Sequence, residues 1–246
     1  MKKQTLIIGL IFSFFINAHA TTWEKSTHIC PICKTKNKLQ DIVSYGGYIY
    51  SWSSKFQYIF WPLIDSKSVY CCNKCFYSTF MWDFDSIPMN KIEPLKLFLE
   101  TVKLDKTFND YDDIPIITRL EIAENIYKTI GKDSEFWCKF YRVMGYHYDA
   151  EKNIPKAKES RQKSLDLAKK MLSDSLYHGQ EKETMYIIAS MHNFLGQKDS
   201  ALILLNQAST KTYQNKNWKD KDNKGLNDYL TKLIIEYKDL IKNNSK

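Results

Sequence analysis

The sequence Cys30-Pro31-Ile32-Cys33 and its counterpart Cys72-Asn73-Lys74-Cys75 decide the start of the fold. A Cys-x-x-Cys turn lets two thiolates face one metal ion, and two such turns close a tetrahedral four-thiolate shell around zinc. Because thiolates fill all four positions of such a shell, water has no place on the metal, and the zinc is structural. The sequence therefore predicts a structural zinc bound by Cys30, Cys33, Cys72 and Cys75.

The insert between the two turns, residues 34–71, favours β-structure. Its segments Ile42–Tyr50 and Lys55–Trp61 are rich in Tyr, Phe, Ile and Trp, and Ser51–Ser54 separates them. Aromatic and β-branched runs bounded by small polar residues are typical of strands. Strands and paired cysteine turns together predict a small zinc-ribbon-like head.

A disulfide framework is the first alternative to zinc. Six cysteines is an even number, and disulfides persist in exported proteins. Paired Cys-x-x-Cys turns are, however, an unusual way to link strands, and the adjacent Cys71 and Cys72 complicate pairing. Zinc binding remains our prediction.

A periplasmic thiol-disulfide oxidoreductase is the second alternative. Cys-Pro-Ile-Cys resembles a glutaredoxin-type motif, which opens a helix after a strand. Here Cys30 follows a short polar leader, and Lys34–Lys38 has no apolar helix period. The surroundings of the motif thus favour a metal turn.

The remaining candidate ligands are predicted to lie outside the metal site. Cys72 completes a Cys-x-x-Cys pair with Cys75, whereas Cys71 would need a longer loop. His28 could substitute as a ligand but is more simply a solvated side chain. Cys138, in an aromatic helical stretch, is expected to be a small core residue.

The N-terminus has the layout of a cleavable secretory signal. Met1-Lys2-Lys3 precedes an apolar run from Leu6 to Ile16, and Ala18-His19-Ala20 ends it. We predict a signal peptide over residues 1–20, cleavage after Ala20, and a periplasmic or secreted protein. A buried N-terminal strand or helix is the alternative. The first later cysteine is Cys30, so no lipid anchor is expected.

Charge and hydropathy limit the partners. Loss of Lys2 and Lys3 with the signal lowers the net charge from +8 to +6, and the lysines are spread along the chain. An exported protein also meets little nucleic acid, so no nucleic-acid partner is expected. No later stretch approaches the roughly 20 apolar residues of a membrane span.

The composition changes near Asn90, where the helix period replaces the strand-like pattern. We predict a head over residues 21–90 and a helical body of about seven helices over residues 91–246. The predicted class is α+β, with a zinc-ribbon-like β head before a tetratricopeptide-like α-solenoid body. A helical bundle without a functional groove is the alternative.

The clearest repeat unit runs from Met185 to Ala208. Small Ala189 and Ala201 would let two helices approach, and Gly196 would make the turn between them. A weaker copy leads to Ala157, which is 44 residues before Ala201 and so outside the roughly 34-residue tetratricopeptide period. A final amphipathic helix, Leu226 to Ile241, is expected to cover the end of the stack.

The head has an aromatic rim that is too apolar to stand exposed; it comprises Phe56, Tyr58, Phe60, Trp61, Phe80 and Trp82. We predict that this rim packs on the first helices, through Leu95, Phe98, Leu99 and Val102. Head and body then form one unit. The later helices, from Tyr141 to Ala208, would be free to hold a protein or peptide segment.

Several residues carry a resemblance to a known family. The pattern comprises Cys30-Pro31-x-Cys33, Phe60-x-Pro62, Val69-Tyr70-x-Cys72-x-x-Cys75-x-Tyr77 and Asp83-Phe84. It resembles an uncharacterised bacterial family, a domain of unknown function, in which a split zinc ribbon precedes tetratricopeptide-like helices. The resemblance implies ligands at Cys30, Cys33, Cys72 and Cys75. Lys34 and Phe76 stand where the family usually has glycine.

The sequence lacks the common catalytic motifs: we find no phosphate loop, GxSxG elbow, HExxH motif or dinucleotide fingerprint. Asp83 and Asp85 form a close acidic pair, which leaves a hydrolase of unknown substrate as a further alternative. We predict a noncatalytic protein that mediates protein-protein interaction in the cell envelope.

Overall fold

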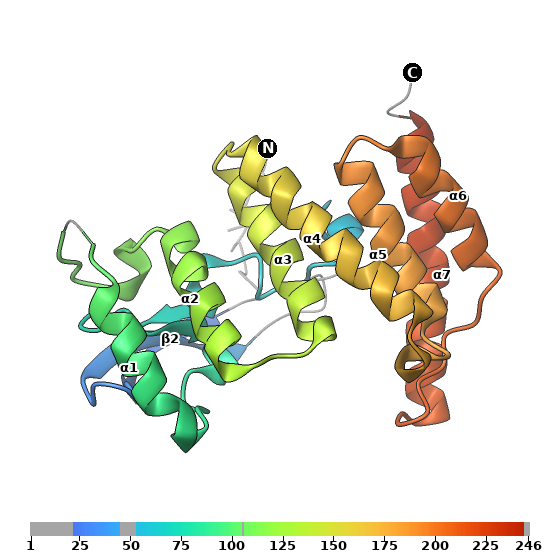
Figure 1. Cartoon of the computed structure of the whole chain (residues 1–246). Helices are drawn as coiled ribbons and strands as arrows, with labels where there is room; N and C mark the ends of the chain where they lie inside the picture. The colour runs from blue at the N-terminus through green and yellow to red at the C-terminus, as the bar shows by residue number, and fades with distance from the viewer. Residues whose placement is uncertain (1–21, 45–52, 105, 244–246) are drawn as a thin grey trace, which may run out of the picture.

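The structure, a computed structural model, describes residues 22–44, 53–104 and 106–243, so the predicted signal peptide lies outside the described residues. Two β-hairpins precede seven α-helices within these residues, which confirms the α+β class. The strands are β1 (Thr22–Ile29), β2 (Lys36–Ser44), β3 (Val69–Cys71) and β4 (Ser78–Phe80). The helices are α1 (Ile92–Thr101), α2 (Ile116–Ile130), α3 (Ser134–Ala150), α4 (Ile154–Ser173), α5 (Glu181–Phe194), α6 (Lys198–Ser209) and α7 (Asp220–Asn243). Figure 1 shows the hairpins with α1 and α2 at one end and α5 to α7 at the other.

The two hairpins are separate two-stranded antiparallel sheets, β1 with β2 and β3 with β4. Strand β1 occupies what the sequence suggested to be a polar leader. None of its side chains is fully buried and most are polar, so it carries no apolar strand signal. The predicted strand Ile42–Tyr50 overlaps the end of β2, and its residues 45–50 lie outside the described residues.

The prediction of a strand at Lys55–Trp61 is wrong. Residues Ser53–Gln57 form a 3-10 helix, η2, and Tyr58 has a φ of 56°. The Phe56 ring stacks on Tyr237 of α7, with ring centroids 4.9 Å apart, and the Tyr58 ring lies 5.5 Å from Tyr186 of α5. Aromatic side chains that are typical of strands here pack on distant helices, and this packing sets the backbone conformation.

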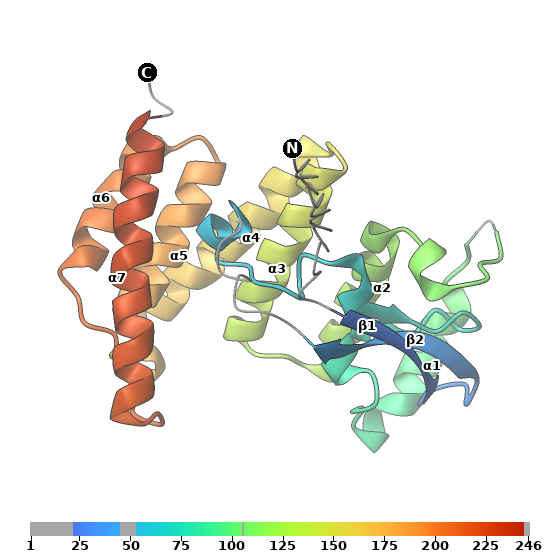
Figure 2. The ribbon, with the colours of Figure 1, turned by 180° about the vertical axis from the view of Figure 1, so that it is seen from behind.

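The segment Ser53–Gln57 lies across the helical body, between the α3–α4 pair and α7 (Figure 2). Ser190 of α5 donates a hydrogen bond of 2.6 Å to the Phe56 carbonyl, and Lys55 forms a 2.5 Å ion pair with Glu236 of α7. The expectation that the rim packs on the first helices is therefore wrong for Phe56 and Tyr58, which pack on α7 and α5. Part of the surface expected to be free is covered by this segment of the same chain.

The later helices pack as two hairpins, α3 with α4 and α5 with α6, as the repeat pattern predicts. Ala189 and Ala201 are fully buried, and Gly196 makes the α5–α6 turn with a φ of 86°. In the α3–α4 pair, a Cβ on Gly145 would lie 3.3 Å from the Ala157 carbonyl oxygen, so glycine permits this close approach. Helix α7 covers the end of the stack and buries Leu230 with the side chains of α5 and α6.

Head and body share their cores. Leu95 and Leu99 of α1 pack with Cys30, Ile32 and Tyr70 of the head. The side chains of β3 and β4 also pack on α2, where the Tyr127 hydroxyl accepts a 2.8 Å hydrogen bond from the Phe80 amide. No helix in the described part of the chain has the length and apolarity of a membrane span.

Candidate metal centre

The first Cys-x-x-Cys pair forms the turn of the β1–β2 hairpin. The Cys30 amide donates to the Thr35 carbonyl at 2.9 Å, and the Lys34 amide donates to the Cys30 carbonyl at 3.0 Å. These bonds fold the backbone around the two sulfur atoms, and Lys34 takes a φ of 61° to complete the turn. Such a left-handed conformation favours glycine.

The second pair repeats the same turn between β3 and β4. The Cys72 amide donates to the Tyr77 carbonyl at 2.9 Å, the Phe76 amide donates to the Cys72 carbonyl at 2.9 Å, and Phe76 has a φ of 59°. Lys34 and Phe76, which stand where the resembling family usually has glycine, thus both take the left-handed conformation that glycine adopts readily. This conformation costs a non-glycine residue roughly 1–2 kcal/mol.

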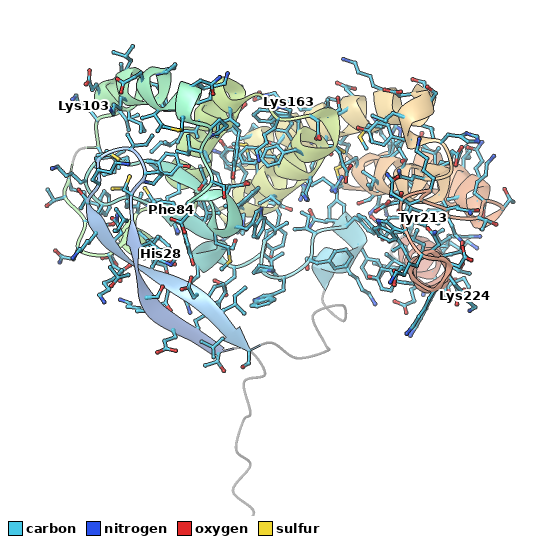
Figure 3. The ribbon with its side chains drawn as sticks, turned by 90° about the horizontal axis from the view of Figure 1, so that it is seen from below. His28, Phe84, Lys103, Lys163, Tyr213 and Lys224 are labelled. Carbon is cyan, nitrogen blue, oxygen red and sulfur yellow. The ribbon has the colours of Figure 1, made fainter. Side chains whose placement is uncertain are left out.

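The two turns bring four sulfur atoms together, with all of them within 4.8 Å of one another. Cys30 Sγ lies 3.6 Å from Cys75 Sγ, and Cys33 Sγ lies 3.5 Å from Cys72 Sγ. A tetrahedral shell with metal–sulfur bonds of about 2.3 Å has sulfur–sulfur edges of about 3.8 Å, whereas a disulfide bond is about 2.05 Å. The spacing thus fits four ligands around one metal ion. Figure 3 shows sulfur atoms gathered at one end of the β1–β2 hairpin, between the labelled Lys103 and Phe84.

Cys30, Cys72 and Cys75 hold their protons unequally. Hydrogen bonds with Cys30 and Cys75 lower the pKa of Cys72 to about 2, and the hydrogen bond with Cys72 raises the pKa of Cys30 to about 12. The hydrogen bond with Cys30 is the largest cause of a raised pKa at Cys75. Thiolates this close repel one another, and a cation at the centre would offset the repulsion. Four sulfur ligands suit a thiophilic ion such as zinc.

Access to the cluster is from one side. Cys30 and Cys72 are fully buried, whereas Cys33 and Cys75 are half-buried. The latter two line a groove of about 500 Å³ between the second turn and α1. A metal ion or chelator can reach the sulfurs through this groove.

The other two cysteines lie outside the cluster, as predicted. Cys71 is buried next to the site, and burial raises the pKa of its thiol to about 12, which keeps it protonated. Cys138 is buried on α3 and packs with Leu165 and Ile188 in the core between α3, α4 and α5.

His28 has a role that the sequence did not indicate. Its Nε2 lies 3.1 Å from Asp41 of β2, and its Nδ1 lies 3.3 Å from Asp85, beyond β4. The Tyr70 hydroxyl of β3 also donates to Asp41, at 2.6 Å, and Ser26 donates to the same carboxylate. This polar network ties the first hairpin to the second.

The acidic pair Asp83 and Asp85 does not converge on one point. Asp83 accepts hydrogen bonds from the Tyr127 hydroxyl at 2.8 Å and from Lys132 at 3.1 Å, whereas Asp85 faces His28. His147, on the buried face of α3, lies 2.9 Å from the Leu63 carbonyl and is a hydrogen-bonded core residue. These groups link the head to the helices.

The Cys30–Cys33 pair, considered above as a redox motif, lies in a turn between two strands. Cys30 follows strand β1, but the chain after Cys33 enters strand β2 and forms no helix. The helix N-terminus that lowers the pKa of the attacking thiol in thioredoxin-like motifs is therefore missing at this position of the described chain.

Fold and site together define a class: a head with a four-cysteine cluster, built from two hairpins, on a body of paired helices. Residues 23–230, most of the chain, match the family described as an uncharacterized protein conserved in bacteria (DUF2225). The chain belongs to this family. A search of curated proteins and a search of solved structures each found no match.

Proposed function

We propose that the chain is an exported, noncatalytic zinc-binding protein whose helical body holds a protein segment in the cell envelope. The observation that carries the zinc assignment is the pair of sulfur distances, 3.5 and 3.6 Å, between cysteines of different hairpins. Four thiolates leave no position on the metal for water, so the zinc is structural. Export rests on the N-terminal sequence pattern.

In this proposal the metal fixes both ends of the insert, residues 34–71. One end leaves the first cysteine turn and the other enters the second, while Ser53–Gln57 crosses to the helices between them. The contacts of Phe56 with Tyr237 and Ser190 attach that crossing segment to the body. Zinc would therefore hold the head hairpins together and also keep the insert seated on the helical body.

Support for an interaction role comes from the paired helices and their exposed apolar side chains. Ile203 of α6 and Ile235 of α7 are each 58 % exposed. A cleft of about 890 Å³ also lies between the start of α5 and the segment before α7, with Tyr177, Tyr213 and Trp218 in its walls. Clefts between packed helices commonly hold segments of partner proteins.

The test is metal analysis of the protein isolated from its exported compartment. We expect about one zinc per chain, and loss of that zinc in Cys72→Ser. Cys71→Ala and Cys138→Ala are matched controls, because both cysteines are buried outside the cluster, and both variants should keep the metal. Disulfides at all four positions without zinc would refute the assignment.

A further inference from the structure

The three arginines of this lysine-rich chain are all buried. Arg119 forms an ion pair of 3.0 Å with Asp112, and Arg161 forms one of 2.7 Å with Asp149. Burying a guanidinium is costly unless an acceptor or a carboxylate compensates the charge. Two of the three arginines are therefore compensated in the expected way.

Arg142, on α3, is the exception. Its side chain is buried, with 5 % exposed, yet no carboxylate of the described residues lies within ion-pair distance of it. Its Nη1 donates to Cys138 Sγ at 3.1 Å, its guanidinium lies 5.8 Å from the Tyr58 ring, and its Nε has no acceptor. A thiol sulfur is a weak acceptor. Arg142 thus forms no ion pair within the described residues, although the Glu183 carboxylate lies near enough to interact with its charge.

Arg142 lines a cavity of about 280 Å³ between the insert and the helices α3 and α5. Phe60, Trp61 and Trp82 supply aromatic walls, and Ile187 supplies an aliphatic one. Glu183, which also lines the cavity, accepts a 2.7 Å hydrogen bond from the Tyr58 hydroxyl. The cavity is close in size to the smaller ligand sites of proteins, and it combines apolar walls with the buried Arg142 guanidinium. Lys139, Glu135 and Glu183 also line it, so its polar part carries charges of both signs.

The cavity continues toward the 890 Å³ cleft, because Glu135, Gln180 and Glu183 line both. The cleft has room for several residues of an extended chain, whereas the small cavity has room for one side chain and an anion. A chain that ends at Arg142 would place its last residue in the cavity and the preceding residues in the cleft.

We propose that this cavity binds the C-terminal residue of a polypeptide, with the terminal carboxylate accepting hydrogen bonds from Arg142 and an apolar side chain against Trp61 and Trp82. Guanidinium and carboxylate groups form strong charge-assisted hydrogen bonds. The inference rests on the proposed role of the helical body and names the chemistry of its partner.

The experiment uses the zinc-loaded full mature chain and two probes, N-acetyl-Ala-Ala-Ala-Phe with a free C-terminal acid and the same peptide with a C-terminal amide. Isothermal titration calorimetry should give binding of the acid at least about tenfold tighter than that of the amide, because only the acid offers a charged acceptor. Equal affinities, or no binding of either peptide, would overturn the proposal.

Two variants test whether Arg142 causes the preference for the acid. Arg142→Met should abolish the preference for the acid, while Arg161→Met, which also removes a buried guanidinium but lies outside the cavity, should keep it. If Arg142→Met fails to fold, the acid and amide affinities of the unmodified chain decide. Zinc content is measured on the same samples. If the protein contains zinc but does not prefer the acid peptide, the binding proposal fails and the zinc assignment stands. If the protein contains no zinc, the zinc assignment fails.

Discussion

The two cysteine turns have the same backbone hydrogen bonds but very different support. All six residues of β3 and β4 are buried, and the Val69 carbonyl accepts a 2.6 Å hydrogen bond from Arg119. In the first hairpin, β1 buries none of its residues and β2 buries only Asn37 and Leu39. Both turns reach the core, but the strands of the second hairpin are built into it, whereas the strands of the first hairpin lie mostly at the surface.

This difference indicates where a metal contributes most. The second hairpin has apolar burial and hydrogen bonds to α2 that hold it in place. The first hairpin has its turn residues Cys30 and Ile32, Leu39 and the polar network around Asp41. We infer that the proposed zinc would mainly attach the first hairpin to a preformed second one.

Metal removal should therefore separate the two hairpins, and this is the largest expected effect. Structural zinc sites have apparent binding free energies of about 10–16 kcal/mol, which become folding free energy. After chelation, amides of Thr22–Ser44 should exchange hydrogen nearly as fast as in an unfolded chain, while those of Val69–Phe80 stay protected. Hydrogen exchange with mass spectrometry measures both, with Cys71→Ala as the metal-binding control. Equal loss of protection in the two hairpins would contradict the inferred difference.

Arg119→Met should be the next largest effect, and it acts on the second hairpin. Arg119 pairs with Asp112 and donates to the carbonyls of Ser66, Val69 and Ile114, so its removal takes one donor from each of these acceptors. Breaking a buried ion pair typically costs about 3–5 kcal/mol. Urea unfolding measures the loss. Lys25→Met, which removes the exposed ion pair between the first hairpin and Asp110, is the control and should cost far less, because solvent screens exposed charges.

Asp41→Asn should weaken the link between the hairpins by about 1 kcal/mol, since it changes the acceptor of the Tyr70 hydroxyl. Burial favours a raised pKa at Asp41, but hydrogen bonds from Ser26 and Tyr70 and the nearby His28 outweigh it, so the pKa is lowered in the folded state. The stability from the carboxylate is then complete above the unfolded pKa of about 3.9 and is lost as the pH falls through the lower folded value.

The measurement is the stability difference between the unmodified chain and Asp41→Asn across pH. At low pH, protons compete with the metal for the cysteine sulfurs. This loss of stability is the same in both proteins, so it cancels in the stability difference. A difference that stays constant from pH 7 to pH 2 would show that the charge of Asp41 does not contribute.

The sequence predicted features that depend on local spacing. The cluster of Cys30, Cys33, Cys72 and Cys75 follows from two short turns, and each turn needs only its own residues. The α5–α6 unit follows from small residues and Gly196 at helical intervals. Such patterns survive because the interactions that produce them lie close together in the chain.

The sequence could not predict features that depend on distant packing. Strand β1 is polar, because one hairpin face meets solvent and its pairing uses backbone groups. The run from Lys55 to Trp61 has strand composition but contacts Tyr186 and Tyr237, more than 120 positions away. The cavity around the buried Arg142 is visible only once α3 and the insert meet. No local pattern records these contacts.

The smallest predicted effect compares the residue that closes each turn. Lys34 and Phe76 have φ angles of 61° and 59°, where glycine is favoured by roughly 1–2 kcal/mol. Lys34 is exposed, so Lys34→Gly should stabilise the zinc-loaded protein by up to about 1 kcal/mol, after the entropy that glycine adds to the unfolded chain. Phe76 is packed against the core that contains the cysteines, so Phe76→Gly loses apolar burial that offsets the same relief, and no gain is expected. Thermal unfolding of the two variants measures the contrast, with Lys152→Gly as control, because Lys152 is exposed at a φ of 61° in the α3–α4 turn far from the cysteines. Stabilisation by Lys152→Gly without stabilisation by Lys34→Gly would mean that the first turn carries no strain to relieve, and that zinc does not hold it in the conformation described.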